Sequence, residues 1–249
     1  MGFFDRFFTK STRTDKSADL SLIGVDMHSH FIPGIDDGAQ TIEDSVNLLR
    51  AMSEFGYRKV ITTPHIMSDF YQNNPEIILA GLAKVKEAIQ QEGIAIEVEA
   101  AAEYYLDFDL EAKIEKGGLL TFGNNYLLFE VSYMNPPDIL NQVIFKLATN
   151  GYRPVLAHPE RYPFWYNDFE KYEEFKDKGV LLQLNINSLT GYYGGGAKKI
   201  AEQMIEKNMV DFIGSDCHRM DHIKVMKDAQ CEKYLHLLID SGMLRNAAL

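Results

Sequence analysis

The chain has 249 residues, of which 46% are hydrophobic and 24% are charged. This composition is ordinary for a globular domain with a sizeable core, and it excludes disorder, collagen-like repeats and coiled coil as the main structure. Acidic residues outnumber basic residues by 36 to 25, which leaves a formal net charge of −11 with neutral histidines. A chain this acidic repels nucleic acid and anionic lipid unless it carries a local positive site. We therefore predict no nucleic-acid partner.

The two cysteines, Cys217 and Cys231, are too few for a disulfide framework, which indicates a reducing compartment. No run approaches the roughly 18 consecutive apolar residues of a membrane span. The N-terminus also lacks the apolar run of a signal peptide, so we expect a cytoplasmic protein. Residues 1–20 contain four phenylalanines and several basic residues. We expect this segment to be a mobile extension in front of one domain, residues 21–249, with weak peripheral membrane contact as the alternative.

From residue 20 onward, short apolar or β-branched runs alternate with helical patterns. The runs that predict strands are 22–27, 59–63, 94–101, 126–131, 153–157, 180–186 and 210–214. The patterns that predict helices are 41–55, 75–92, 107–116, 136–150, 168–178, 196–208 and 222–242. Seven strand–helix units in strict alternation predict an α/β fold, with a parallel sheet and helices outside it.

Local signals mark several boundaries along the chain. Thr41 precedes the first helical pattern with Asp44 three residues later, which is typical of a helix N-terminus. Pro75, and the pair Pro136 and Pro137, mark two further helix starts. An open doubly wound sheet is the alternative architecture, but no Gly-x-Gly-x-x-Gly turn follows the first strand. The glycine-rich segment 191–196 comes after the sixth strand and is interpreted as a flexible rim loop.

Polar residues collect where the predicted strands end. In a closed parallel barrel these ends share one face, and barrel enzymes place their active sites there. This pattern favours a seven-stranded barrel, and it predicts that residues distant in sequence meet in one cleft. The residues concerned are His28, His30, His65, Glu103, Glu130, His158, Glu160, Arg161, Asp216 and His218.

The spacing of these residues indicates a metal site. His28 and His30 are two residues apart, so on extended chain both imidazoles point the same way. Asp216 and His218 repeat this geometry, which turns Cys217 away from the cleft. A single histidine or acid at a strand end is more often a hydrogen-bonding residue than a ligand. Imidazoles and carboxylates on successive strands together suit a borderline divalent ion such as manganese, iron or zinc.

The motifs that carry these residues resemble a known superfamily. His28-Ser-His30, Thr63-Pro-His65, His158-Pro-Glu-Arg161 and Ser215-Asp-x-His218 look like the polymerase-and-histidinol-phosphatase (PHP) superfamily. With Asp-Asp-Gly at 36–38, they are similar to bacterial PHP-type protein-tyrosine phosphatases of capsule and exopolysaccharide systems. The resemblance spans roughly residues 24–240. It implies a distorted seven-stranded TIM-like barrel, (β/α)7, with two to three divalent ions, usually manganese or iron, and zinc as an alternative.

The resemblance also implies three ion positions, with Glu103 bridging two of them. Asp36 is a rival to Asp37, which we prefer because the ligand of that family directly precedes the glycine. The implied sets are His28, His30, Glu103 and Asp216 for the first ion, Asp37, His65 and His218 for the second, and Glu103, Glu130 and His158 for the third.

For the residues that contact phosphate and substrate, this sequence departs from the family pattern at one position. Arg161 is implied as the phosphate clamp, whereas Glu160 beside it is expected to form a salt bridge or a cap. The family usually places Asn after the last ligand histidine and an arginine several residues later. Here Arg219 follows His218 directly, so a second catalytic phosphate contact and an exposed surface role both remain open for Arg219. Tyr105 and Tyr162 are expected to contact a phenyl ring of the substrate.

The function implied is metal-dependent hydrolysis of phosphotyrosine on a protein, such as the tail of a bacterial tyrosine kinase in the regulation of capsule or exopolysaccharide synthesis. A hydroxide that bridges two metals would attack phosphorus in line, without a covalent intermediate. Cysteine catalysis is excluded because Arg219 lies too close to Cys217 for an anion-binding loop. A phosphatase for histidinol phosphate or another small phosphomonoester is the alternative. A catalytically silent partner of a membrane kinase is a third hypothesis, against which the full ligand set argues.

Overall fold

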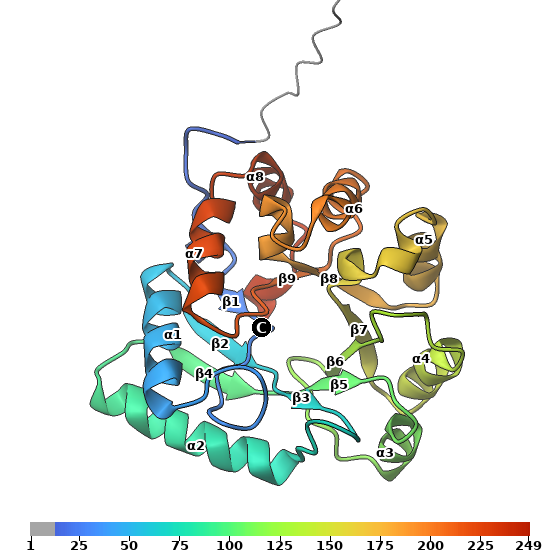
Figure 1. The fold of residues 1–249 in the computed structure, drawn as a ribbon, viewed down its shortest axis with the longest axis horizontal. Coiled ribbons are helices and arrows are strands. Elements are labelled where there is room, and N and C mark those ends of the chain that lie inside the picture. Colours follow the sequence, from blue (N-terminus) through green and yellow to red (C-terminus); the bar gives the residue numbers. More distant parts are fainter. Residues whose placement is uncertain (1–12) are drawn as a thin grey trace, which may run out of the picture.

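The computed structural model describes residues 13–249. Strand segments occupy the centre and helices surround them (Figure 1). The strands are β1 Val25–Asp26, β2 Lys59–Thr62, β3 His65–Ile66, β4 Glu97–Ala100, β5 Glu103–Tyr105, β6 Tyr126–Glu130, β7 Arg153–Ala157, β8 Leu181–Asn185 and β9 Phe212–Gly214. The helices are α1 Ile42–Glu54, α2 Pro75–Gln91, α3 Leu110–Lys116, α4 Leu140–Thr149, α5 Glu170–Asp177, α6 Gly195–Glu206, α7 Met220–Ala229 and α8 Lys233–Asp240.

The strands form two parallel sheets, with the orders β1-β2-β4 and β3-β5-β6-β7-β8-β9. Two predicted strands, 59–63 and 94–101, are each followed by a second short segment beyond the predicted end, β3 and β5. The second strand is interrupted at Pro64, which has no backbone N–H to donate to a ladder. The third strand is interrupted after Ala100. Counting each of these pairs as one strand position leaves seven positions, as predicted, and the parallel α/β architecture is confirmed.

The first and last strand positions meet beyond the ends of β1 and β9. Ser29 and Cys217 form an isolated parallel bridge, and Asp216 N donates to His28 O at 2.8 Å. Among the described residues no continuous ladder joins β9 to β1. The ring is thus brought together at the carboxyl ends of the strands, which are also the ends where the polar residues collect.

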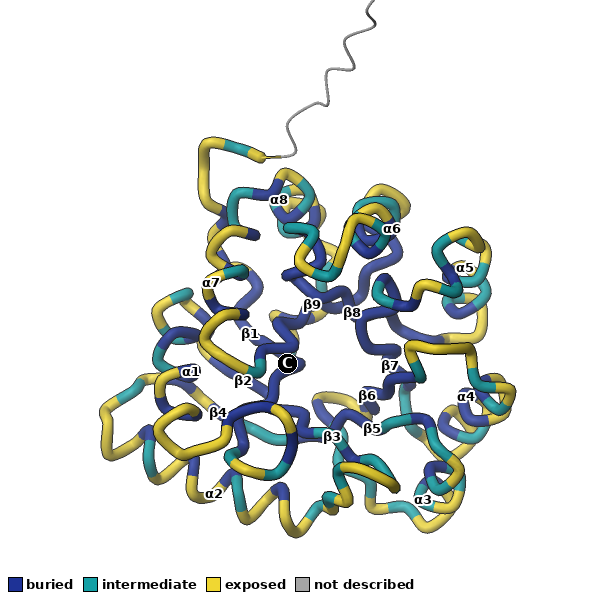
Figure 2. Tube along the Cα trace, in the orientation of Figure 1, coloured by how far each residue is buried: buried dark blue, intermediate teal, exposed yellow. Residues whose placement is uncertain are grey.

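Two apolar cores lie on the two faces of the ring of strands. The inner core contains alternate strand residues, among them Val25, Leu128, Val155 and Phe212. The outer core contains the intervening residues, such as Phe129, and the facing sides of the helices. The strands are buried almost throughout, and exposed residues lie on the outer helices and loops (Figure 2). This burial on both faces explains the near-continuous apolar strand sequences.

Two predicted helix starts are confirmed and one is wrong. Thr41 and Asp44 form a reciprocal capping box at α1, and Asn74 caps α2 with Pro75 in its first turn. The predicted helix 136–150 instead begins at Leu140, so Pro136 and Pro137 precede the helix rather than opening it.

The predicted helix 222–242 is two helices, α7 and α8, separated at residues 230–232. The carbonyls of Gln230 and Cys231 accept hydrogen bonds from Ala18 N and Thr14 N. The described part of the predicted extension therefore docks where the helices separate. Residues 1–12, on which the predictions of mobility and membrane contact also rest, lie outside the described residues. None of the described helices combines the length and apolarity that crossing a bilayer requires.

We expect Asn246→Ala to lower the free energy of unfolding by at least about 2 kcal/mol, because it leaves several buried polar groups without a partner. The Asn246 side chain accepts from Ile213 N at 3.0 Å and donates to Val25 O and Ile213 O, so it joins β1 to β9. Urea unfolding would measure the change. Asn47→Ala, on the exposed face of α1, is the control, and an equal effect of both variants would contradict the role of Asn246.

Candidate metal centre

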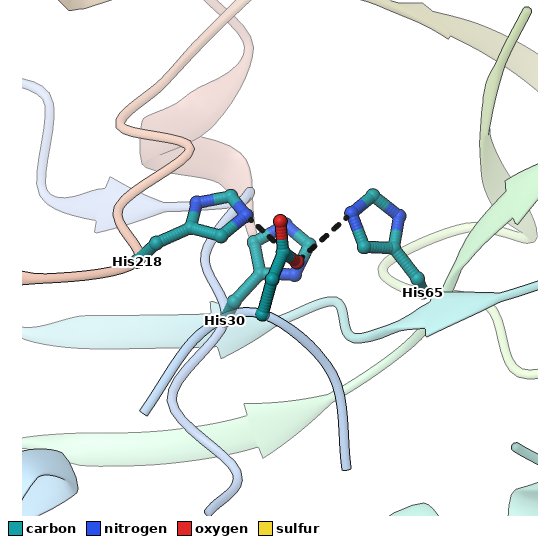
Figure 3. Close-up of side chains that lie close together, drawn as sticks. His30, His65 and His218 are labelled. Carbon is teal, nitrogen blue, oxygen red and sulfur yellow. Dashed lines mark ion pairs between the residues drawn. The ribbon is translucent and has the colours of Figure 1, made fainter. Parts of the chain in front are cut away.

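All nine predicted ligands lie together at the carboxyl ends of the strands. Strand alternation aims some of them inward: Glu130 follows Leu128 of the inner core, and Asp216 follows Phe212 at an even spacing. The rings of His30, His65 and His218 converge from separate segments (Figure 3). Groups of donor atoms that lie within 4.8 Å of one another are His30, Asp37, His65 and His218; His28, His30 and Glu103; His28, His158 and Asp216; and His65, Glu103 and Glu130.

Glu103 lies at the centre of this cluster. Its Oε2 is 3.2 Å from His28 Nε2, 3.5 Å from His30 Nε2 and 3.2 Å from His65 Nδ1. Its Oε1 is 3.2 Å from His158 Nε2. Glu103 is fully buried, so a carboxylate here requires neighbouring positive charge. The bridging position expected for Glu103 is consistent with these four contacts.

Asp37 and Asp36 occupy different places. Asp37 Oδ1 lies 3.5 Å from His65 Nε2 and 3.4 Å from His218 Nε2, and these ion pairs are the dashed lines of Figure 3. Asp36 lies behind His30, where its Oδ2 is 2.8 Å from His30 Nδ1. Asp36 also accepts hydrogen bonds from Gly38 N and His65 N. Its position is that of a residue that orients a ligand histidine through the second ring nitrogen.

The backbone at two candidate ligands is unusual. His158 has φ 35° and Asp216 has φ 48°, and the other described non-glycine residues with positive φ are two asparagines. Left-handed backbone is costly for residues with a Cβ and tends to occur at functional sites. These conformations turn the chain at the ends of β7 and β9.

Sequence reasoning missed two residues that hold the candidate ligands. Gln183 Oε1 lies 2.9 Å from His28 Nδ1 and accepts from His158 N at 3.2 Å. Asn185 Nδ2 donates to Asp216 Oδ2 at 3.0 Å. Both alternate inward along β8, as the spacing from Leu181 of the inner core shows. A polar pair at alternate positions of an otherwise apolar strand was the only signal available.

The cluster strongly perturbs its own protonation equilibria. Burial alone would raise the pKa of Glu103, but the positive charges of His28 and His65 outweigh it and hold the pKa well below its ordinary value. Burial lowers the pKa of His65, whereas the charge of Glu103 opposes this and raises the pKa to about 9. The carboxylates therefore draw positive charge into the site.

A cavity of about 220 Å³ opens above the cluster, and its lining includes Arg161 and all four candidate ligand carboxylates. Arg161 Nη1 lies 2.5 Å from Asp216 Oδ2. Tyr105 lines the cavity, and so does Tyr133, which was not among the predicted substrate contacts. Tyr162 does not reach the cavity: it is fully buried, and its hydroxyl accepts from Val131 N at 3.1 Å. Tyr162 supports the wall rather than forming its surface.

The remaining predicted residues lie around this cavity. Arg219 is exposed and lines a neighbouring hollow of about 280 Å³ that shares Asp37 and His218 with the cavity. Glu160 is buried and accepts from Ser188 Oγ at 2.6 Å, so it joins the segment after β7 to the segment after β8. Cys217 is also buried, which raises the pKa of its thiol and disfavours a reactive thiolate.

The donor set fits divalent ions. Five histidines and four carboxylates supply the nitrogen and oxygen ligands that manganese, iron and zinc accept. His65 Nδ1 is buried and lacks a hydrogen bond of acceptable geometry, although Glu130 Oε1 is only 3.1 Å away. Once its proton is displaced, this nitrogen offers a lone pair that suits a metal ion.

Comparisons with known proteins define the class. The family of capsular polysaccharide synthesis proteins CpsB/CapC matches residues 24–246. The tyrosine-protein phosphatase YwqE of Bacillus subtilis is 29% identical over 197 residues, which are 79% of this chain and 78% of that protein. A solved structure from work on YwqE of B. subtilis and CpsB of Streptococcus pneumoniae, described as metal-dependent tyrosine phosphatases, superposes with a TM-score of 0.77 at 27% identity. The match covers 89% of this chain and 94% of that one.

A histidinol phosphate phosphatase of Lactococcus lactis, solved with zinc, L-histidinol and phosphate, gives a TM-score of 0.50 at 13% identity over 86% of this chain and 94% of that one. This likeness shows a common fold. Fold and comparisons together define a barrel protein of the metal-dependent tyrosine phosphatase class. The chain belongs to the CpsB/CapC family of capsular polysaccharide synthesis.

We expect Gln183→Leu to lower metal affinity about 10- to 100-fold, because it removes the acceptor that fixes the His28 ring. Metal content after dialysis against a graded chelator series, determined by atomic emission, would measure the loss. Gln203→Leu, on α6 and away from the cluster, is the matched control. Equal retention of metal by both variants would show that Gln183 has no such role.

Proposed function

We propose that this protein hydrolyses phosphotyrosine on a protein substrate, using divalent metal ions held at the carboxyl ends of the strands. The observation that carries the proposal is the largely buried cluster of five histidines and four carboxylates beneath a cavity lined by Arg161. The similarity to YwqE and CpsB over most of the chain supports the substrate class. Regulation of capsule or exopolysaccharide synthesis is the corresponding physiological role.

We propose that the site binds two to three divalent ions. These ions are manganese or iron, with zinc as the alternative. The proposed ligand sets remain those implied by the family resemblance. The first set is supported by the mutual approach of His28, His30, Glu103 and Asp216. The second is supported by Asp37 between His65 and His218. For the third, His65 rather than His158 lies with Glu103 and Glu130 in this structure, so His65 competes with His158 for that set.

The chemistry follows from these positions. Bound divalent ions would lower the pKa of water and supply a hydroxide nucleophile near neutral pH. Arg161 presents a planar set of N–H donors to the cavity, which suits the non-bridging oxygens of a phosphate. Tyr105 and Tyr133 line the same cavity and offer apolar contact to a phenyl ring. Asp36 and Gln183 fix the imidazoles from behind through their second ring nitrogens.

The partner proposed is a phosphotyrosine protein such as a bacterial tyrosine kinase, and the compartment proposed is the cytoplasm. Both cysteines are free thiols, which fits a reducing environment. Arg219 is proposed as a second phosphate contact, approached from the hollow that adjoins the cavity at His218.

Replacing each of the two neighbouring aspartates separately shows which one binds a metal ion and which one orients a ligand histidine. We expect Asp37→Asn to reduce the number of bound metal equivalents by one, because it removes the carboxylate between His65 and His218. Asp36→Asn should keep the number of equivalents and weaken affinity about tenfold, as loss of an orienting hydrogen bond does. Metal titration monitored by calorimetry would measure both quantities. The reverse pattern would assign Asp36 as the ligand.

The substrate class is tested by comparing turnover of phosphotyrosine peptide with that of histidinol phosphate. We expect metal-loaded protein to prefer the peptide and His28→Ala to abolish hydrolysis of both substrates. Arg161→Lys should lower kcat/KM about 100-fold, because a point charge replaces a planar donor set. Arg50→Lys is the control, because Arg50 lies on α1 and forms an exposed ion pair with Glu92. Preference for histidinol phosphate would favour the alternative function, and wild-type turnover by His28→Ala would exclude metal-dependent hydrolysis.

A further inference from the structure

The glycine-rich segment 191–196, expected to be a flexible rim loop, is fixed at both ends. Gly194 N donates to Gly191 O at 2.9 Å, and α6 begins directly at Gly195. A Cβ on Gly196 would come within 2.2 Å of the Tyr166 ring, so the backbone packs closely against that ring. The conformation of the segment is therefore defined by contacts on both sides of Tyr193.

Tyr193 lies against the guanidinium of Arg161. The distance from Arg161 Cζ to the centre of the Tyr193 ring is 4.0 Å, and the distance to the Tyr133 ring is 5.1 Å. A guanidinium this close to an aromatic face is attracted by the ring quadrupole. The two rings pack against the guanidinium and leave its in-plane N–H groups free to donate hydrogen bonds. One of its nitrogens, Nη1, already faces Asp216.

Asn185 links the Tyr193 ring to the metal cluster. Its Nδ2 donates to Tyr193 Oη at 3.3 Å and to Asp216 Oδ2 at 3.0 Å. The carboxylate that attracts Arg161 and the ring on which Arg161 lies are thus held by the same amide. In contrast, the Tyr133 Oη also lies 3.4 Å from His158 Nδ1. Removal of Tyr133 would therefore disturb a candidate ligand directly.

We propose that Tyr193 is a positioning residue that holds the Arg161 guanidinium in the orientation from which it binds the phosphate group of the substrate. This inference rests on the proposed function. Without the ring, the guanidinium would retain its attraction to Asp216 but lose the contact that limits its rotation. Loss of this contact would weaken phosphate binding and leave the metal content unchanged.

The test measures the dissociation constant of inorganic phosphate on metal-loaded protein by calorimetry, which does not depend on turnover. We expect Tyr193→Leu to weaken phosphate binding about tenfold, and Tyr193→Phe, which keeps the ring, to stay within about twofold of wild type. Tyr192→Leu, an exposed neighbour in the same segment, is the matched control and should bind phosphate as wild type does. Metal content should be equal in all four proteins.

A double-mutant cycle with Arg161→Leu isolates the pair. In that background Tyr193→Leu should have no further effect, because the group it positions is absent. Wild-type phosphate affinity in Tyr193→Leu, an undiminished effect in the Arg161→Leu background, or loss of metal from Tyr193→Leu would each overturn the inference. Failure of wild-type protein to hydrolyse phosphotyrosine would instead overturn the proposed function, so the two failures are distinguishable.

Discussion

One buried carboxylate, Glu103, requires positive charge close to it, and the arrangement of the strand ends around the site depends on this requirement. Its two oxygens lie within 3.5 Å of nitrogens from His28, His30, His65 and His158, which come from the first, second and fifth strand positions. An isolated charge at this depth would cost several kcal/mol. The fold must therefore bring those strand ends to one point, and the site in turn depends on the contact between the first and last strand positions at Ser29 and Cys217.

The irregularities of the barrel lie next to this cluster. The second strand breaks at Pro64, immediately before His65, and the third breaks just before Glu103. His158 and Asp216 adopt left-handed backbone at the ends of β7 and β9. A regular strand presents alternate side chains to the interior, and such a strand does not aim side chains from so many directions at one carboxylate. The interruptions allow the last residues of each strand to turn toward the centre, whereas the lower part of the ring keeps its regular apolar packing.

The sequence predicted the parts of the molecule that are encoded locally. Strand–helix alternation indicated the architecture, and paired polar residues such as Asp216 and His218 marked the strand ends. The sequence did not predict the start of α4, since Pro136 and Pro137 resemble a helix start but lie ahead of Leu140. The separation of α7 from α8 coincides with long-range hydrogen bonds from Thr14 and Ala18, which no local pattern contains. The supporting residues Gln183 and Asn185, and the burial of Tyr162, likewise depend on packing between distant strands.

The charge of the site resolves the apparent conflict between an acidic protein and an anionic substrate. The net charge of −11 counts acids and bases over the whole chain, whereas a ligand responds to the field inside the cavity. There, Arg161 and histidines with a raised pKa, such as His65, face the carboxylates. Divalent ions would replace protons on these imidazoles, because metal binding requires deprotonated ligands and releases protons. Three such ions would contribute six positive charges against the four carboxylates Asp37, Glu103, Glu130 and Asp216. The pocket would then attract a phosphate dianion while the acidic surface continued to repel extended polyanions.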